Sequence, residues 1–477
     1  MKKRLLLAGK YQRREGSLDE VRTQRTITMS IGTAAYQRAA SIAMRAQDRR
    51  KTRAQREGSE DVMYARTKYK VALLGSHLPR HCGIATFTSD LHDALQAECS
   101  EIEPFVIAVN DTGRRYVYRD QVRLEIFEGE IASYRRAADF LNANSVDVLC
   151  LQHEYGIYGG KSGAHVLALL RELRMPIVTT LHTILAEPTA SQRFVMDELT
   201  QLSERMVVMS QHGAALLRRV HQVPESKIDL IPHGIDSVPL GDGSKDSLGL
   251  EGQSVILTFG LLSPDKGIEY MIDALPAILA RFPNTVYIVL GATHPHVKEF
   301  DGETYRLMLE NRAKRLGVES QVRFHNQFVS RGELREFLSA ADIYVTPYLK
   351  PEQITSGTLA YALGSGKAVI STPYWYAEEL LADGRGLLVP WRDSVAIAKH
   401  VIELLANESD RHAMQRRAAA YMKEMAWPTV ARQYVQSFEQ AAQGHKVPLS
   451  NPFHEWTIGS QPAELAELRS VSSSFDE

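Results

Sequence analysis

The sequence predicts an α/β protein with two doubly wound domains, because short apolar runs alternate with helical patterns in two separate series. Each run has the length of a buried strand, and a stretch with helical periodicity follows it. A polar stretch that contains several glycines, Val238–Gln253, separates the two series and is typical of a linker. Two such series predict two Rossmann-like domains whose sheets face a central cleft.

The first series begins at Tyr69. Its strands are expected at Lys70–Gly75, Phe105–Val109, Val146–Gln152, Ile177–Leu181 and Met206–Met209. Helical patterns lie between these runs, for example at Gly163–Leu173 and Gln192–Leu202.

The second series repeats this order after the linker. Its strands are expected at Val255–Phe259, Val286–Leu290, Val322–Phe324, Ile343–Val345, Ala368–Ile370 and Gly386–Val389. A last helical pattern follows Trp427-Pro428. We therefore expect a basic arm at 1–66, domains at 67–240 and 241–426, a helix at 427–444 that crosses back to the first domain, and a polar tail at 445–477.

The composition is that of an ordinary globular protein. Of the 477 residues 44% are hydrophobic and 24% are charged, and the net charge is −1. This balance argues against a nucleic-acid or membrane role for the whole chain, and no apolar run is long enough to span a bilayer. The three cysteines, Cys82, Cys99 and Cys150, lack CxxC spacing, which indicates reduced thiols in a cytoplasmic protein and no structural metal.

The first 70 residues are strongly basic. They hold 18 Lys and Arg against 7 Asp and Glu, whereas the rest of the chain is acidic. Three interpretations stay open for this arm: a solvated tail, a helix that touches anionic lipid, and upstream sequence (1–62) included by a wrong choice of start. We expect that catalysis does not require it.

The stretch Tyr344–Thr372 has the pattern strand, loop, helix, strand. Thr355-Ser356-Gly357 opens its helix, and Glu352 lies just before it. A helix start presents unpaired N–H groups and a positive dipole end, so a loop of this kind is a common site for phosphorylated ligands. A plain strand-to-helix turn in which Ser or Thr caps the helix is the alternative.

Other loop residues follow strands at the same edge of each sheet. In the first domain these are Gly83, the pair His153 and Glu154, and His182. In the second domain Lys266 stands at the expected start of a helix, where a cation can neutralise phosphate. Each has an ordinary alternative, namely a tight turn, a packed histidine or a surface lysine. Their shared position at the carboxyl ends of strands favours a binding site.

With these segments the chain resembles the family-4 retaining glycosyltransferases, which have the GT-B fold. The resemblance covers about residues 70–440. It is carried by CGIATFT, QHEYGIYGG, LHT at Leu181–Thr183, IPHGID at Ile231–Asp236, SPDKG, and the EQITSGTL and GSGKAVIST strings.

The resemblance implies an acceptor domain followed by a donor domain, with a nucleotide sugar linked to GDP or UDP as substrate and neither a cofactor nor a metal. It implies that His182, Lys266 and Glu352 are catalytic, with Lys266 on the donor phosphate and Glu352 on the sugar hydroxyls. Further donor contacts are implied at Gly83, Ile354, Thr355, Ser356, Gly357 and Thr358. Acceptor-side residues are implied at His153, Glu154 and Tyr155.

The sequence departs from the family pattern at two positions. Leu261 stands where the family usually has an arginine, and Ala360 stands where a second glutamate holds the nucleotide ribose. A lost contact of either kind is worth roughly 1.5–3 kcal/mol. Either neighbours such as Ser356, Thr358 and Tyr361 compensate, or the donor differs from the usual one.

The function expected from these features is that of a metal-independent retaining hexosyltransferase, with mannose or glucose as the sugar and a carbohydrate or small glycosyl acceptor. Two alternatives are a glycoside phosphorylase of the same fold and a non-catalytic module that senses a sugar or nucleotide. The sequence does not decide the oligomeric state.

Overall fold

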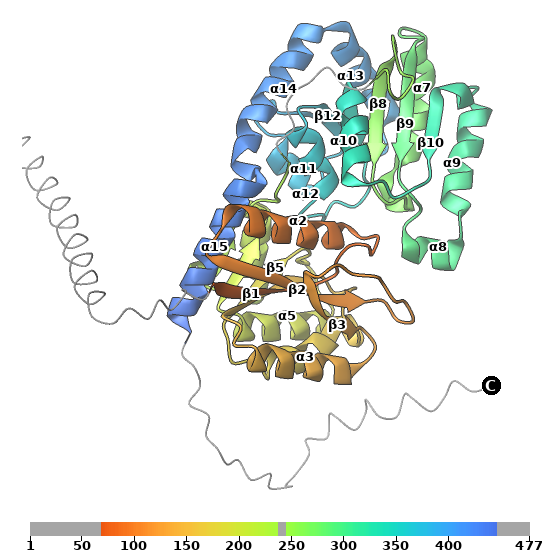
Figure 1. Cartoon of the computed structure of the whole chain (residues 1–477). Coiled ribbons are helices and arrows are strands. Elements are labelled where there is room, and N and C mark those ends of the chain that lie inside the picture. Colours follow the sequence, from red (N-terminus) through yellow and green to blue (C-terminus); the bar gives the residue numbers. More distant parts are fainter. Residues whose placement is uncertain (1–67, 237–244, 446–477) are drawn as a thin grey trace, which may run out of the picture. The chain divides into compact units, whose positions relative to one another are not determined.

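The computed structural model describes residues 68–236 and 245–445, which form two parallel β-sheets flanked by helices. This architecture confirms the α/β class with two Rossmann-like units (Figure 1). The basic arm, the tail beyond His445 and the first part of the linker lie outside the described residues.

The first sheet has seven parallel strands in the order β3-β2-β1-β4-β5-β6-β7. Their bounds are β1 Tyr69–Gly75, β2 Ile102–Asn110, β3 Val122–Phe127, β4 Val148–His153, β5 Ile177–Leu181, β6 Arg205–Val208 and β7 Ile228–Leu230. The helices of this domain are α2 Gly83–Glu98, α3 Ile131–Ala143, α4 Leu167–Leu170, α5 Ala190–Leu202 and α6 Gln211–His221.

The second sheet has six parallel strands in the order β10-β9-β8-β11-β12-β13. Their bounds are β8 Ser254–Phe259, β9 Thr285–Leu290, β10 Val322–His325, β11 Ile343–Thr346, β12 Ala368–Ser371 and β13 Leu387–Leu388. The helices are α7 Ile268–Leu279, α8 Pro295–Asp301, α9 Thr304–Arg315, α10 Arg331–Ala340, α11 Gly357–Gly364, α12 Trp375–Leu380, α13 Ser394–Ala406, α14 Glu408–Met422 and α15 Trp427–Gly444.

The central strands are apolar throughout because helices cover both faces of each sheet. In β1, Val71 and Leu73 belong to the core shared with α2 and α15, whereas Ala72 and Leu74 belong to the core shared with α3, α4 and α5. Figure 1 shows α2 on one side of this sheet and α3 with α5 on the other. In the second domain, α10, α11, α12 and α14 cover one face, and α7, α9 and α13 cover the other.

Three local expectations differ from the structure. The helix expected at Gly163–Leu173 is a 3₁₀ segment, Lys161–Val166, followed by the single turn of α4, because Ser162 and Gly163 have positive φ angles of 55° and 79°. The strands β3 and β7 were not predicted. They lie at the two edges of their sheet and carry exposed or half-exposed residues, so they lack a continuous apolar run.

The chain crosses between the domains twice, and the two crossings are joined. Ile235 pairs with Ala426 in a parallel bridge, in which the Ile235 N–H donates to Met425 O (2.9 Å) and the Trp427 N–H donates to Ile235 O (3.1 Å). After the second crossing, α15 packs on the first domain through Trp427, Tyr434 and other buried residues. In Figure 1 this last helix runs alongside the first sheet.

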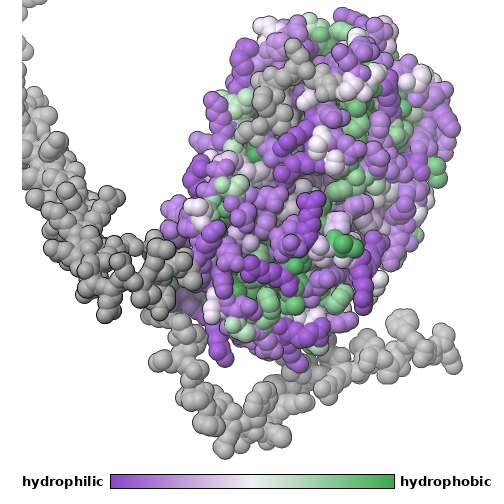
Figure 2. All heavy atoms as spheres, viewed as in Figure 1, coloured by the Kyte–Doolittle hydropathy of each residue, from purple (hydrophilic) through white to green (hydrophobic). Residues whose placement is uncertain are grey.

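The viewed surface of the described residues is mainly hydrophilic, and apolar residues appear on it in scattered patches (Figure 2). None of the helices in the described part of the chain has the length and hydropathy that a membrane crossing requires.

A substitution at Gly234 tests how tightly the two crossings are packed together. A Cβ atom at this position would lie 2.2 Å from Cε3 of Trp427, so Gly234→Ala forces the indole ring to move. We expect this change to lower the free energy of unfolding by about 1–3 kcal/mol, measured by urea denaturation. Gly444→Ala is the control, because no atom lies within 4 Å of its built Cβ. Equal stability of the two variants would contradict the tight contact.

Candidate active site at the two switch points

The strand order places one switch point in each sheet. In the first it lies between β1 and β4, and in the second between β8 and β11. The loops that leave these strands diverge to opposite faces, and ligands of doubly wound sheets bind in the crevice between such loops. Gly83 and Glu154 follow β1 and β4, and Lys266 and Glu352 follow β8 and β11. These four sequence-predicted residues therefore lie on the loops of the two switch points, whereas His182 follows the neighbouring strand β5.

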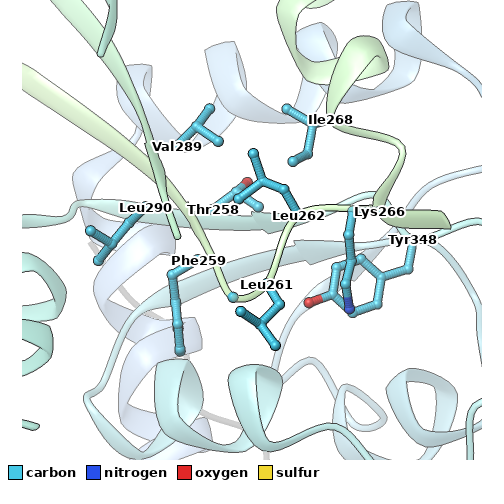
Figure 3. Close-up of a pocket in the computed structure, with 10 residues that line it drawn as sticks. Thr258, Phe259, Leu261, Leu262, Lys266, Ile268, Val289, Leu290 and Tyr348 are labelled. Atoms are coloured by element: carbon cyan, nitrogen blue, oxygen red, sulfur yellow. The ribbon is translucent and has the colours of Figure 1, made fainter. Parts of the chain in front are cut away.

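Lys266 lies beside an aromatic ring at the second switch point. Its Nζ atom is 3.8 Å from the centre of the Tyr348 ring, and both residues line a small pocket with the loop after β8. Figure 3 shows the lysine running along the tyrosine ring, with Leu261 lining the same pocket. Lys266 ends a 3₁₀ turn, Pro264–Lys266, and α7 begins two residues later at Ile268, so the lysine precedes the helix instead of opening it.

The start of α11 faces the same loop. Ser356 caps this helix by accepting the N–H of Leu359 (3.4 Å), which is the cap named in the alternative interpretation of this segment. The Thr358 hydroxyl lies 2.9 Å from the Tyr348 hydroxyl and 3.2 Å from Ser356 Oγ. Gly260, with a φ of 127°, brings the loop after β8 close to Thr358, because a Cβ there would lie 3.1 Å from Thr358 Cγ2. This arrangement gathers Lys266, two hydroxyls and a helix N-terminus.

The residues just before α11 contact the first domain. Ile354 is 4% exposed and packs in a hydrophobic cluster with Leu181 and Ile184, and the Thr355 hydroxyl contacts Met209 Sδ (3.4 Å). Their side chains therefore hold the loop against the first domain, and a ligand contact through them stays a prediction. Glu352 is exposed, and its carboxylate has no hydrogen bond or ion pair within the described residues.

Glu154 lies at the first switch point. The Thr183 hydroxyl donates to its Oε2 atom, and the Tyr155 N–H donates to Oε1 (2.9 Å). Burial raises the pKa of this carboxyl, while these two donors and the nearby Lys350 ammonium of the second domain oppose the shift.

His153 is fully buried, and neither of its ring nitrogens has a hydrogen-bond partner within the described residues. Its ring packs edge-on against Tyr155, with 5.0 Å between the centroids, and Tyr155 is itself buried. Both residues point into the packed interior, which does not favour the acceptor contact expected for them. That role stays a prediction.

His182 follows β5 and is 8% exposed. Its Nε2 atom lies 3.0 Å from Gln152 Oε1, and its ring meets the Phe87 ring edge-on at 5.0 Å. Burial lowers its pKa to about 3, helped by the neighbouring His233 and His153. The imidazole is therefore neutral at physiological pH.

His233 is a site residue for which the sequence analysis proposed no role. Its ring also meets the Phe87 ring edge-on, with 5.1 Å between the centroids, and its Nδ1 atom is 2.8 Å from Gly234 O. A Cβ at Gly357 would lie 3.0 Å from its Nε2 atom, so the histidine abuts the start of α11. The sequence signal for this residue is the IPHGID string. No role followed from it, because nothing local in the sequence shows that this segment meets α11.

Side chains of the two domains also meet along α2. The carboxylate of Asp90 accepts the Tyr361 hydroxyl and contacts the Arg331 guanidinium, and Arg331 and Arg335 lie 3.8 Å and 2.6 Å from Asp236. Closer to the first switch point, the ring of His81 stacks on Phe328 at 4.6 Å.

Ala360 has no exposed surface and packs in the apolar core of the second domain. Tyr361 is engaged by Asp90, so Ser356 and Thr358 are better placed than Tyr361 to compensate for the missing glutamate. Within the ranges that the structure covers, no three His, Cys, Asp or Glu residues come together as metal ligands.

Comparison with known proteins identifies the two halves separately. The family model described as Glycosyltransferase Family 4 matches residues 82–238, and the model described as Glycosyl transferases group 1 matches residues 243–421. Together they cover every strand of the two sheets except β1, and the loops that carry Gly83, Glu154, Lys266 and Glu352.

Among curated relatives, a phosphatidyl-myo-inositol mannosyltransferase of Mycolicibacterium smegmatis is 25% identical over 325 residues, 67% of this chain and 78% of that protein. A D-inositol 3-phosphate glycosyltransferase of Corynebacterium efficiens is 24% identical over 369 residues, 72% of this chain and 83% of that protein. These names and the family models support glycosyl transfer as the type of reaction.

Solved structures share the fold. The HepE protein of Anabaena in complex with UDP and glucose superposes with a TM-score of 0.62 at 17% identity and covers 78% of this chain and 99% of that one. Sucrose-phosphate synthase of Thermosynechococcus elongatus gives a TM-score of 0.63 at 18% identity, with the same coverage. Both confirm the GT-B architecture that the sequence predicts.

The buried histidines predict a pH dependence of stability. Burial lowers the pKa of His153 and His182 to about 3 and that of His233 to about 4, below the ordinary value of 6.5. Between these values the unfolded chain binds protons that the folded chain excludes, so stability falls as pH falls from 6.5 towards 4.

His153→Phe removes one such site and should reduce this slope by up to about 1.4 kcal/mol per pH unit. Chemical denaturation at several pH values between 4 and 6.5 measures it. The control is His412→Phe on α14, whose side chain is half exposed. A His153 variant with the wild-type slope would show that this ring is protonated in the folded protein.

Proposed function

We propose that this chain, which belongs to the group 1, family-4 glycosyltransferases, transfers a hexose from a nucleotide sugar to an acceptor hydroxyl and retains the α configuration. The observation that carries the proposal is the convergence of Lys266 and the start of α11 at the second switch point. A cation and a helix N-terminus are the groups that a diphosphate requires.

The proposed reaction breaks the bond between the anomeric carbon and the β-phosphate oxygen, and the electron pair leaves with the phosphate. The acceptor oxygen forms the new bond on the same face, and its proton passes to the departing phosphate oxygen. Negative charge therefore develops at the phosphate, where Lys266 and the first N–H groups of α11 stabilise it. The scheme uses no metal ion and no resident cofactor.

The sugar contacts are assigned to both domains. Glu352, whose carboxylate has no partner within the described residues, accepts hydroxyl hydrogen bonds of the transferred sugar. His182 approaches the sugar from the first domain. Contacts across the domains, such as Asp90 with Arg331, support a closed form in which water is kept from the reaction.

The names of the relatives support a mannosyl donor and an inositol-containing acceptor, and the neighbours in complex with UDP support a nucleoside diphosphate. Leu261 and Ala360 lack the side chains that would bind the pyrophosphate and the ribose, so donor binding is weaker. The Thr358 hydroxyl lies beside Tyr348 and is best placed to replace part of the lost contacts.

A panel of nucleotides and sugar nucleotides tests the reaction class. A bound donor at 100 times its dissociation constant should stabilise the folded chain by about 2.7 kcal/mol, measured by thermal shift. Release of nucleoside diphosphate with an inositol or hexose acceptor supports the proposal. Turnover that needs inorganic phosphate instead indicates a phosphorylase, and binding without turnover indicates a sensing module.

Lys266→Ala should lower kcat/KM at least about a hundredfold, which corresponds to some 2.7 kcal/mol of transition-state stabilisation. Steady-state kinetics with the donor found in the panel measures it. Lys314→Ala, at an exposed position of α9, is the control and should keep wild-type kinetics. A Lys266 variant as active as this control would leave the lysine as a packing residue on Tyr348.

A further inference from the structure

A chain of buried hydrogen bonds leads from the last helix to His182. Tyr434 of α15 lies with its hydroxyl 3.0 Å from Thr180 Oγ1 on β5. Thr180 Oγ1 is 3.5 Å from Gln152 Nε2 on β4, and Gln152 Oε1 is 3.0 Å from His182 Nε2. Tyr434, Thr180 and Gln152 have no exposed surface.

Each end of the Gln152 amide has its own neighbours. The Nε2 end lies near two acceptors, Thr180 Oγ1 and Cys150 Sγ (3.3 Å), and the Oε1 end faces the ring of His182. In this orientation the amide oxygen accepts a hydrogen bond, so the proton of the neutral imidazole is on Nε2. Nδ1 then carries the lone pair.

The other contacts of His182 leave Nδ1 as the available atom. Phe87 packs edge-on against the ring, at an interplanar angle of 86°. Both ring nitrogens of His153 are buried and have no hydrogen-bond partner within the described residues. The Nδ1 atom of His182 also makes no hydrogen bond within these residues, but unlike the His153 nitrogens it is not fully buried. Nδ1 is thus the ring atom that can accept a hydrogen bond from a ligand.

We propose that Gln152 is a positioning residue for transfer, which holds His182 as the Nε2–H tautomer with Nδ1 directed to the substrate, and that Thr180 and Tyr434 hold Gln152. The role of His182 rests on the proposed function, but the tautomer does not. Under this proposal α15 has two roles. It packs in the core of the first domain, and through Tyr434 it supports the hydrogen-bond chain that ends at His182.

The tautomer is measured first, in the full chain without substrate. Protein labelled with 15N-histidine is recorded by long-range 1H–15N spectroscopy at neutral pH, and His182→Asn assigns the signal. We expect the coupling pattern of an Nε2–H imidazole for His182. An Nδ1–H pattern would mean that the Gln152 amide lies the other way round, and it would overturn the proposal.

Gln152→Glu tests the link to catalysis. A carboxylate at this position still accepts the Nε2–H bond but favours the imidazolium, while His233 and His153, the titratable groups next to His182, oppose it. Protonation of Nδ1 removes the lone pair. The variant should therefore show an acidic limb in kcat/KM near neutral pH that the wild type lacks. Gln436→Glu, at an exposed position of α15, should keep the wild-type profile.

Tyr434→Phe is the mild variant at the far end of the chain. It removes one hydroxyl and keeps the packed ring, so we expect an unchanged KM and a kcat lower by about threefold to tenfold, as for one lost hydrogen bond. Unchanged kcat here, together with an unchanged pH profile in Gln152→Glu, would overturn the proposal. If no sugar nucleotide is turned over by any variant or by the wild type, the proposed function fails while the tautomer result still stands.

Discussion

The main-chain pairing of Ile235 with Ala426 is the constraint on which the rest of the structure depends. It joins the two places where the chain crosses between the domains, and Trp427 closes over Gly234 so tightly that a side chain there would collide with the ring. Two crossings that are bonded to each other restrict relative motion of the domains more than one flexible linker would. The pairing also sets where α15 starts, and hence how it lies on the first domain.

The consequences of this pairing reach the site from both sides. His233 lies two residues before Ile235, and its ring abuts Gly357 at the start of α11. Tyr434 lies on α15 and supports Gln152 through Thr180. Phe87 contacts the rings of His182, His233 and Trp427, so one aromatic side chain connects the paired crossings to His182. The candidate site is therefore built on the paired crossings as well as on the loops of the two sheets.

The sequence allowed the prediction of central strands because those strands are buried on both faces, which requires uninterrupted apolar runs such as Val71–Leu74. The edge strands were not predicted, because all residues of β3 except Ile126 are exposed or half-buried and β7 spans only three residues. The Gly163–Leu173 prediction was wrong because helical periodicity does not reveal that Ser162 and Gly163 adopt positive φ angles.

For the site, the sequence places Gly83, Glu154, Lys266 and Glu352 after the switch-point strands and His182 after β5, because position after a strand is a local property. Partners across the fold are not local. Nothing near Gln152 in the sequence points to Tyr434, and nothing near His81 points to Phe328. The burial of His153 and the packing role of Ile354 depend in the same way on segments that lie far away along the chain.

A crystal structure of the chain with a bound nucleoside diphosphate tests the central claim most directly, namely that a diphosphate binds between Lys266 and the start of α11. The account predicts that the terminal phosphate contacts Lys266 Nζ and backbone N–H groups at Gly357 and Thr358. A diphosphate bound away from both Lys266 and α11, or on the first domain, would contradict it.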